Sequence, residues 1–140
     1  MILRCNFEEL RALTAGGRSL LEGDSEGHAS VLAPAESRAR VEALLPRLTG
    51  DLSVASLAEA RGMRTAVRAI VEFLRAEMEA TVLATHAADE SAVAAYFDFA
   101  HALSVFYRLH EMVTEMEALV ELVTGEPADA ETARTFRFPD

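Results

Sequence analysis

The sequence predicts a helix-dominated α+β fold, in which a small N-terminal α/β part precedes two long antiparallel helices. The 140 residues are 51% hydrophobic and 26% charged, which is typical of one globular domain. Alanine supplies 26 residues and all 13 basic residues are arginine, whereas glycine and proline number only 7 and 4. Alanine, leucine, arginine and glutamate favour helices. We expect one domain with three parts, residues 1–57, 58–125 and 126–140, and an all-α assembly is the alternative.

The first 22 residues contain one strand pattern and one helix pattern. Residues 2–5 are a short apolar run that could form a strand. Asn6 and Glu9 have the spacing of a capping box, which favours a helix that begins after Asn6. Gly16 and Gly17 predict the end of this helix.

Residues 18–57 predict further short elements. Residues 18–22 and 28–33 flank a polar turn and suggest a hairpin, although residues 18–22 could instead prolong the preceding helix. Pro34 marks a helix start, and an apolar stripe follows it at residues 41–48. Residues 51–54 alternate polar and apolar, a weak strand pattern.

Two long helices account for most of the remaining chain. Residues 63–85 form one amphipathic face, which is defined by Met63, Val67, Ile70, Leu74, Met78, Thr81 and Thr85. The second helix is expected over residues 90–124, with Asp89 as its N-cap and Gly125 and Pro127 after its end. The tail from residue 129 predicts one helical turn followed by an extended segment at residues 135–138.

The second helix is apolar on more than one face. Its expected main seam is Tyr96, Phe99, Leu103, Phe106, His110, Val113 and Val120, and Phe97, Val105, Leu109, Met112, Met116 and Leu119 widen it. The second helix would be about 52 Å long and the first about 36 Å, which leaves about 15 Å of apolar helix uncovered. We therefore expect a homo-oligomer interface made by Phe99, Leu103, Phe106, His110, Val113, Met116 and Val120.

The charge is concentrated in the C-terminal half. Residues 1–75 hold 10 Arg and 10 acidic residues, whereas residues 76–140 hold 3 Arg and 13 acidic residues and so carry the whole net charge of −10. This field repels nucleic acid and suits either solubility or a basic protein partner.

A strip of arginines on one helix side could bind anions, but two of them have glutamates at i+4, which indicates surface ion pairs. The strip is Arg61, Arg64, Arg68 and Arg75, and the glutamates are Glu72 and Glu79.

No motif in the sequence indicates catalysis, a metal or a cofactor. Residues 23–27 match the Gly-x-Ser-x-Gly pattern of a hydrolase, but acidic residues flank Ser25 and would oppose an oxyanion. The single Cys5 predicts a buried, inert thiol. His110 interrupts the apolar seam, so we expect it to be withdrawn from water there. Together with Tyr96 and His101, it is the candidate for ligand binding or pH sensing.

The function predicted from these observations is a non-enzymatic interaction or oligomerisation protein with an acidic C-terminal surface. A first alternative is a small enzyme or ligand-binding domain, with its pocket between the N-terminal part and the long helices. A second is an acidic inhibitor that grips a basic partner with Glu111, Glu115 and Glu121, and a third is a nucleic-acid regulator that uses the arginine strip. Without a predicted membrane span or signal segment, and with one cysteine, the expected location is the cytoplasm.

Overall fold

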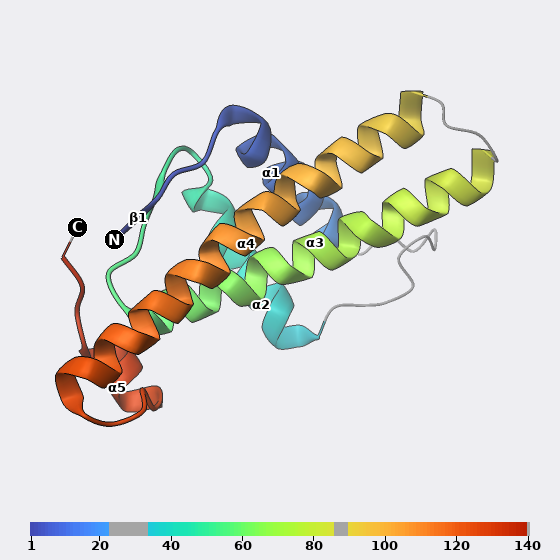
Figure 1. Cartoon of the computed structure of the whole chain (residues 1–140). Coiled ribbons are helices and arrows are strands. Elements are labelled where there is room, and N and C mark those ends of the chain that lie inside the picture. Colours follow the sequence, from blue (N-terminus) through green and yellow to red (C-terminus); the bar gives the residue numbers. More distant parts are fainter. Residues whose placement is uncertain (23–33, 86–89, 140) are drawn as a thin grey trace.

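The computed structural model describes residues 1–22, 34–85 and 90–139, and most of these residues are helical (Figure 1). Two short strands, β1 (Ile2–Leu3) and β2 (Leu52–Ser53), pair in antiparallel fashion, with Leu3 opposite Leu52. The predicted fold class, a helix-dominated α+β fold with a small N-terminal sheet and two long helices, is therefore confirmed.

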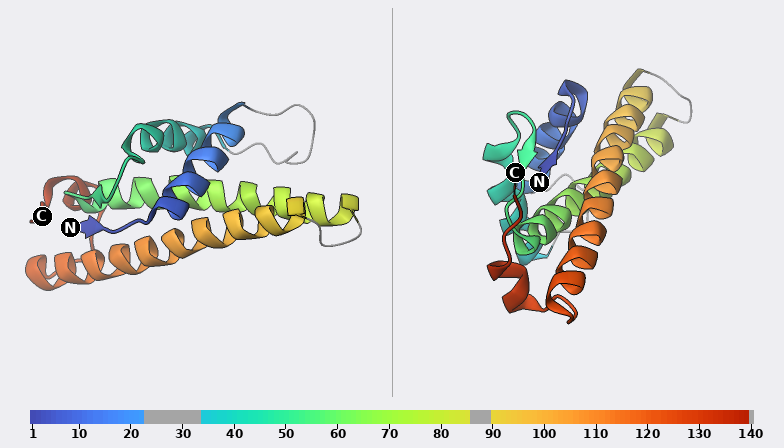
Figure 2. Two further views of the ribbon diagram at one scale, coloured as in Figure 1. Left: turned by 90° about the horizontal axis from the view of Figure 1, so that it is seen from above. Right: turned by 60° about the vertical axis from the view of Figure 1, so that its left-hand side comes forward.

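The long helices form an antiparallel hairpin on which the shorter helices pack. The helices are α1 (Phe7–Glu22), α2 (Ala35–Leu44) with its 3₁₀ continuation η1 (Leu45–Arg47), α3 (Leu57–Thr85), α4 (Glu90–Thr124) and α5 (Ala130–Thr135). Helix α3 lies in the middle, with α2 on the side away from α4 (Figure 2). Helix α1 contacts both long helices. Helix α4 therefore lies at the outside of the molecule and is covered on one side.

The hydrophobic core surrounds α3. Because α3 is covered by α4 on one side and by α1 and α2 on the other, it buries side chains on several of its faces. The predicted face of this helix is confirmed at four positions, since Met63, Val67, Ile70 and Leu74 are all buried. Helix α2 contributes Val41 and Leu44 from the stripe that the sequence predicted.

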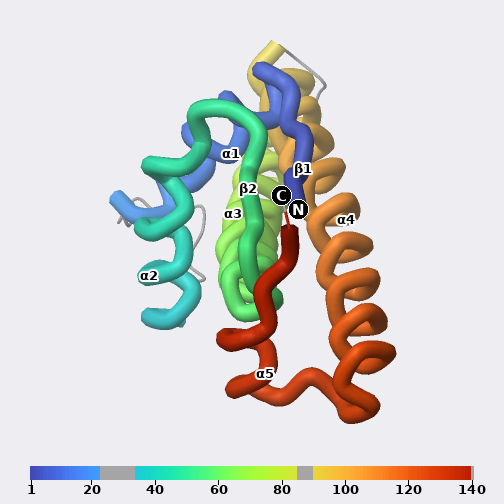
Figure 3. The backbone as a smooth tube through the Cα atoms, turned by 90° about the vertical axis from the view of Figure 1, so that its left-hand side faces the viewer, coloured from blue at the N-terminus to red at the C-terminus, as the bar shows by residue number. Residues whose placement is uncertain are grey.

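The small sheet is extended by the C-terminal segment (Figure 3). Arg137 forms an isolated antiparallel bridge with Ser56, and the Phe138 amide donates a hydrogen bond to the Ala55 carbonyl at 2.9 Å. Asp129 caps α5, because its carboxylate accepts a hydrogen bond from the Thr132 amide at 2.8 Å. The predicted helical turn followed by an extended segment is therefore confirmed.

The predicted end of α1 at Gly16 and Gly17 is wrong. The helix continues to Glu22, and both glycines are buried where α1 crosses α3 and η1. A Cβ on Gly16 would lie 2.9 Å from Cγ2 of Ile70, so the glycine permits a close helix crossing instead of ending the helix. Residues 18–22 are helical, as the alternative expectation held, and the second hairpin segment, residues 28–33, lies outside the described residues.

The first long helix is longer than predicted. It begins at Leu57 because Ser56 caps it: the Ser56 hydroxyl accepts a hydrogen bond from the Glu59 amide at 3.1 Å. Helix α3 has 29 residues and is about 43 Å long, and α4 has 35 residues and is about 52 Å long. The two helices therefore differ in length by about 9 Å. The prediction that about 15 Å of the second helix extends past the first is wrong. The predicted bounds of α4 are confirmed at both ends.

We expect Gly16→Ala to destabilise the protein by about 1–2 kcal/mol, because overpacking against Ile70 and Leu74 exceeds the gain in helix propensity. Chemical denaturation measures this change. The matched control is Gly62→Ala in α3, where the new Cβ meets only the flexible end of Arg40 and stability should stay constant or rise. Equal effects of the two substitutions would contradict the close-crossing explanation.

Candidate functional site

The side of α4 that faces away from the core carries large apolar side chains. The core-facing side is formed by Ala92, Ala102, Val105, Leu109, Val113, Met116 and Val120. At about 100° per residue, the opposite side contains Val93, Tyr96, Phe97, Ala100, Leu103, Ser104 and Tyr107, which we call the outward face. Tyr96, Phe97 and Tyr107 are 54%, 52% and 59% exposed. Exposed aromatic side chains that share one face are typical of an interaction surface.

The outward face bears no formal charge. Between residues 91 and 107 the sequence contains one charged residue, Asp98. Its carboxylate points toward α1, where it forms an ion pair with Arg11 at 3.0 Å. The outward face is therefore an uncharged surface on a chain whose net charge is −10.

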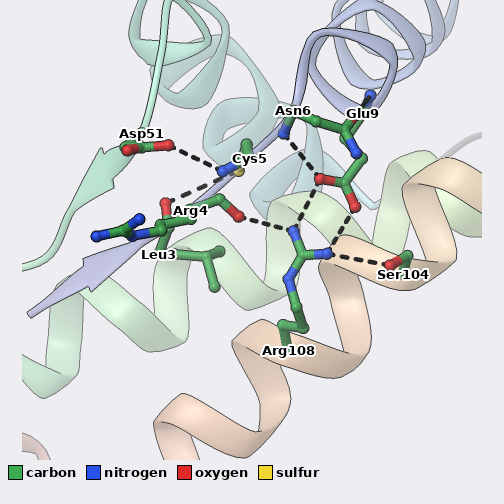
Figure 4. A network of polar contacts seen from close by, with 8 residues as sticks. All are labelled: Leu3, Arg4, Cys5, Asn6, Glu9, Asp51, Ser104 and Arg108. Carbon is green, nitrogen blue, oxygen red and sulfur yellow. Dashed lines mark hydrogen bonds and ion pairs between the residues drawn. The ribbon is translucent and has the colours of Figure 1, made fainter.

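An ion pair between α1 and α4 fixes which side of α4 faces outward (Figure 4). The Arg108 guanidinium donates to both carboxylate oxygens of Glu9, at 2.6 and 2.9 Å, and to the Arg4 carbonyl at 2.8 Å. The Glu9 side chain is 5% exposed and the Arg108 side chain 38%. A bidentate guanidinium–carboxylate contact fixes the orientation of the two groups as well as the distance between them. It therefore holds α4 in one rotation about its own axis.

The predicted capping box of α1 orients the Glu9 carboxylate. The Asn6 side chain accepts a hydrogen bond from the Glu9 amide at 2.8 Å, and Glu9 accepts one from the Asn6 amide at 2.9 Å. Burial by itself would raise the pKa of Glu9, but the hydrogen bonds from Arg108 and Asn6 outweigh it, so the net pKa lies below the ordinary value of 4.5. The carboxylate is thus charged in the folded protein at neutral pH.

Cys5 lies beside this network without the properties of a nucleophile. Its thiol is half-buried and lies 3.9 Å from the Leu3 carbonyl, while its amide donates to Asp51 at 3.0 Å. Burial raises the pKa of the Cys5 thiol, and the nearby Arg108 only partly opposes this. The thiol is therefore protonated at neutral pH, and a thiol is a weaker nucleophile than a thiolate.

Three of the seven residues predicted for the oligomer interface are buried within the chain. Val113, Met116 and Val120 have no exposed surface, because they pack against the rest of the chain, so a partner cannot reach them. His110 was expected inside the seam but is exposed. Its ring stacks on Phe106 with centroids 6.0 Å apart.

The other three predicted interface residues are partly buried. Phe99, Leu103 and Phe106 pack against the edge of the core and keep some exposed surface. Relative to the predicted seam, the N-terminal half of α4 is rotated so that Ala102, Val105 and Leu109 face the core. The physical reason is that this half is apolar nearly all round, so its periodicity does not fix a rotation, whereas Arg108 and Asp98 do.

The residues predicted to bind a ligand do not converge. Tyr96 and His110 are 14 residues apart on one helix, or about 21 Å. His101 lies on the opposite flank of α4 from His110, beside Phe97, with ring centroids 6.4 Å apart. The described part of the chain does contain a groove of about 640 Å³ between α1, α2 and α3, but none of these three residues lines it.

The arginine strip is mostly engaged in ion pairs. Arg68 and Arg75 contact Glu72 and Glu79, each at 3.2 Å, as the i,i+4 spacing predicted. Arg61 lies 3.6 Å from Glu117 and donates to the Ala128 carbonyl at 3.2 Å. Arg64 differs, because its guanidinium contacts the His110 ring at 3.3 Å.

Sequence reasoning missed part of the outward face. Val93, Ala100, Ser104 and Tyr107 belong to neither the predicted seam nor the wider apolar arc, and Phe97 belongs only to the wider arc. The stretch from residue 91 to 107, with one charge in 17 positions, was the available signal, because an exposed helix normally carries charged residues on its solvent side.

Comparisons with protein-family models, with curated proteins and with solved structures returned no match to this chain. Within the described ranges, no helix has the length and hydropathy that a bilayer crossing requires.

We expect the Glu9–Arg108 pair to contribute a coupling free energy of about 2 kcal/mol at pH 7, measured by a double-mutant cycle with Glu9→Gln and Arg108→Met. Because the pKa of Glu9 is lowered on folding, this contribution is complete above pH 4.5 and is lost as the pH falls through the folded pKa. Wild type and Glu9→Gln should therefore converge in stability at acid pH. A difference that stays constant from pH 7 to pH 3 would contradict the assignment.

Proposed function

We propose that the protein is a non-enzymatic interaction protein that assembles as a homodimer through the outward face of α4. The observation that carries the proposal is the uncharged, exposed outward face on a helix that the rest of the described chain covers on one side only. Three aromatic rings that remain more than half exposed represent apolar surface whose removal from water favours association.

The spacing of the outward face supports a second copy as the partner. Its residues are distributed symmetrically about Ala100: Leu103 and Phe97 lie three positions away, Ser104 and Tyr96 four, and Tyr107 and Val93 seven. A two-fold axis through Ala100 would therefore place each large side chain of one helix opposite a residue of the same set on the other. Such self-complementarity is what a two-fold symmetric interface requires. The small Ala100 at the axis permits close approach.

The acidic half of α4 supports an antiparallel arrangement of the two copies. Glu111 and Glu115 are exposed and follow the outward face along the helix. In a parallel pair they would lie beside their own copies and repel each other. In the antiparallel pair centred on Ala100, the two copies of Glu111 are 22 positions apart, or about 33 Å, which exceeds the Debye length at physiological salt.

The acidic-inhibitor alternative is supported by exposed glutamates on α4. Glu111, Glu115 and Glu121 are all exposed, so the acidic C-terminal half of α4 could grip a basic protein. This second proposal requires no self-association, and it predicts binding that weakens steeply with salt. The ligand-binding alternative has less support, because Tyr96, His101 and His110 do not share a pocket.

We expect sedimentation to show a dimer at micromolar concentration, and Phe97→Glu to weaken dimerisation at least ten-fold because it buries a charge in an apolar interface. The matched control is Leu122→Glu. Leu122 is 81% exposed on the same side of α4, but it lies 22 positions from Ala100 and outside the paired segment. A wild-type monomer, or equal effects of both substitutions, would contradict the proposal.

A disulfide tests the position of the two-fold axis. In a Cys5→Ser background we expect Ala100→Cys to form an intermolecular disulfide on mild oxidation, because a residue on the axis meets its own copy. Leu122→Cys should not cross-link in the same background. Non-reducing electrophoresis measures both, and cross-linking of Leu122→Cys alone would place the axis elsewhere.

A further inference from the structure

A pocket with a basic lining lies between α3 and α4. It has a volume of about 310 Å³ and is lined by Arg64, Thr65, Arg68, Phe106 and His110. This described lining contains arginine and histidine but no carboxylate, although the chain has 23 acidic residues. Ligand sites commonly measure about 300–1,000 Å³, so a pocket of this volume suits a small molecule.

Most hydrogen-bond donors of Arg64 remain available to the pocket. One nitrogen of its guanidinium lies 3.3 Å from Nδ1 of His110. A guanidinium donates hydrogen bonds and cannot accept them, so Nδ1 is the acceptor. Among the described residues, Arg64 forms no ion pair, and no other acceptor contacts its guanidinium. His110 therefore orients Arg64 without neutralising its charge.

Arg68 supplies a second guanidinium one turn along α3. Residues four positions apart lie on the same side of a helix, and both arginines line the pocket. Arg68 contacts Glu72 at 3.2 Å, but the two side chains are 70% and 66% exposed, and an exposed ion pair contributes little free energy. An anion with more than one negative charge can therefore use Arg68 as well as Arg64.

The α4 side of the pocket is aromatic. The rings of Phe106 and His110 stack with their centroids 6.0 Å apart and their planes inclined by 17°. Phe106 is partly buried against the core, so its ring offers an apolar wall to an organic group. Thr65 adds no donor, because its hydroxyl donates to the Arg61 carbonyl at 3.1 Å. The pocket thus has guanidinium donors on one side and an apolar wall on the other.

We infer that this pocket binds a small phosphate monoester with an apolar organic part. The phosphate group accepts hydrogen bonds from Arg64 and Arg68, and the organic part packs against Phe106. Such a phosphate carries a charge of about −1.5 to −2 at neutral pH, and a planar guanidinium can donate two parallel hydrogen bonds to its oxygens. None of the lining residues belongs to the outward face, so ligand binding here goes beyond the proposed homodimer and does not depend on it.

Titration with phenyl phosphate tests the site, with NMR of the backbone amides of residues 64–68 and 106–110 as the readout. We expect saturable shifts, and we expect Arg64→Met to weaken binding about ten-fold or more because it removes hydrogen bonds between charged groups. The matched control is Arg75→Met, since Arg75 is exposed on the same helix but contacts Glu79 at 3.2 Å and does not line the pocket. Shifts that do not saturate, or equal effects of the two substitutions, would rule the site out.

Two further probes test the class of ligand. Benzoate has a similar ring but a single charge, and inorganic phosphate has the charge without the ring, so both should bind more weakly than phenyl phosphate. If benzoate binds as tightly, the preference for a phosphate is wrong. If inorganic phosphate binds as tightly, the contact of the organic part with Phe106 is wrong.

The positioning role of His110 has its own pair of variants. His110→Leu should weaken binding of phenyl phosphate, because Arg64 loses its acceptor. His110→Gln should retain binding, because the amide oxygen of glutamine can accept the same hydrogen bond. Circular dichroism verifies that both variants remain folded. A loss of binding in both variants, or in neither, would show that His110 does not act through Arg64.

Discussion

The ion pair between Glu9 and Arg108 is the constraint on which the surface of this protein depends. Helix α4 is apolar on so much of its circumference that hydrophobic burial alone would be nearly satisfied by several rotations about its axis. The guanidinium removes that freedom, because it must reach Glu9 and the Arg4 carbonyl at once. One polar contact at the edge of the core thus decides which apolar side chains are buried and which are exposed.

The same constraint connects the N-terminal segment to the hairpin. Glu9 is held in position by Asn6, and Asn6 lies three residues after the end of β1, so strand, helix start and ion pair are parts of one local structure. Asp98, about three turns earlier on α4, forms a second ion pair with α1, through Arg11. The charged residues of α4 that contact α1 therefore position the helix, while the opposite, uncharged side of residues 93–107 forms the outward face.

The sequence predicted the elements of this fold better than their rotations. The C-terminal bound of α4 followed from Gly125 and Pro127, whereas its predicted N-cap, Asp89, lies outside the described residues. The capping box at Asn6 and Glu9 was identified correctly. Errors arose where one residue type has two physical uses. Gly16 looked like a helix end but permits a close crossing, and that distinction depends on Ile70, which is distant in the sequence. His110 looked like a seam residue because a helix with two apolar arcs has no unique buried side in its periodicity.

The contact between Glu9 and Arg108 spans 99 residues, and this has a consequence for the order of folding. The α3–α4 hairpin needs only contacts across a short connection, so it can form early, whereas closing a loop of this length is slow and costs chain entropy. Until that loop closes, α4 is free to roll against α3 and to present different apolar arcs to it. A hairpin rolled in this way would keep its helices but expose a different set of apolar side chains. Arg108, which fixes the rotation of α4, would therefore also favour the native hairpin over any rolled alternative.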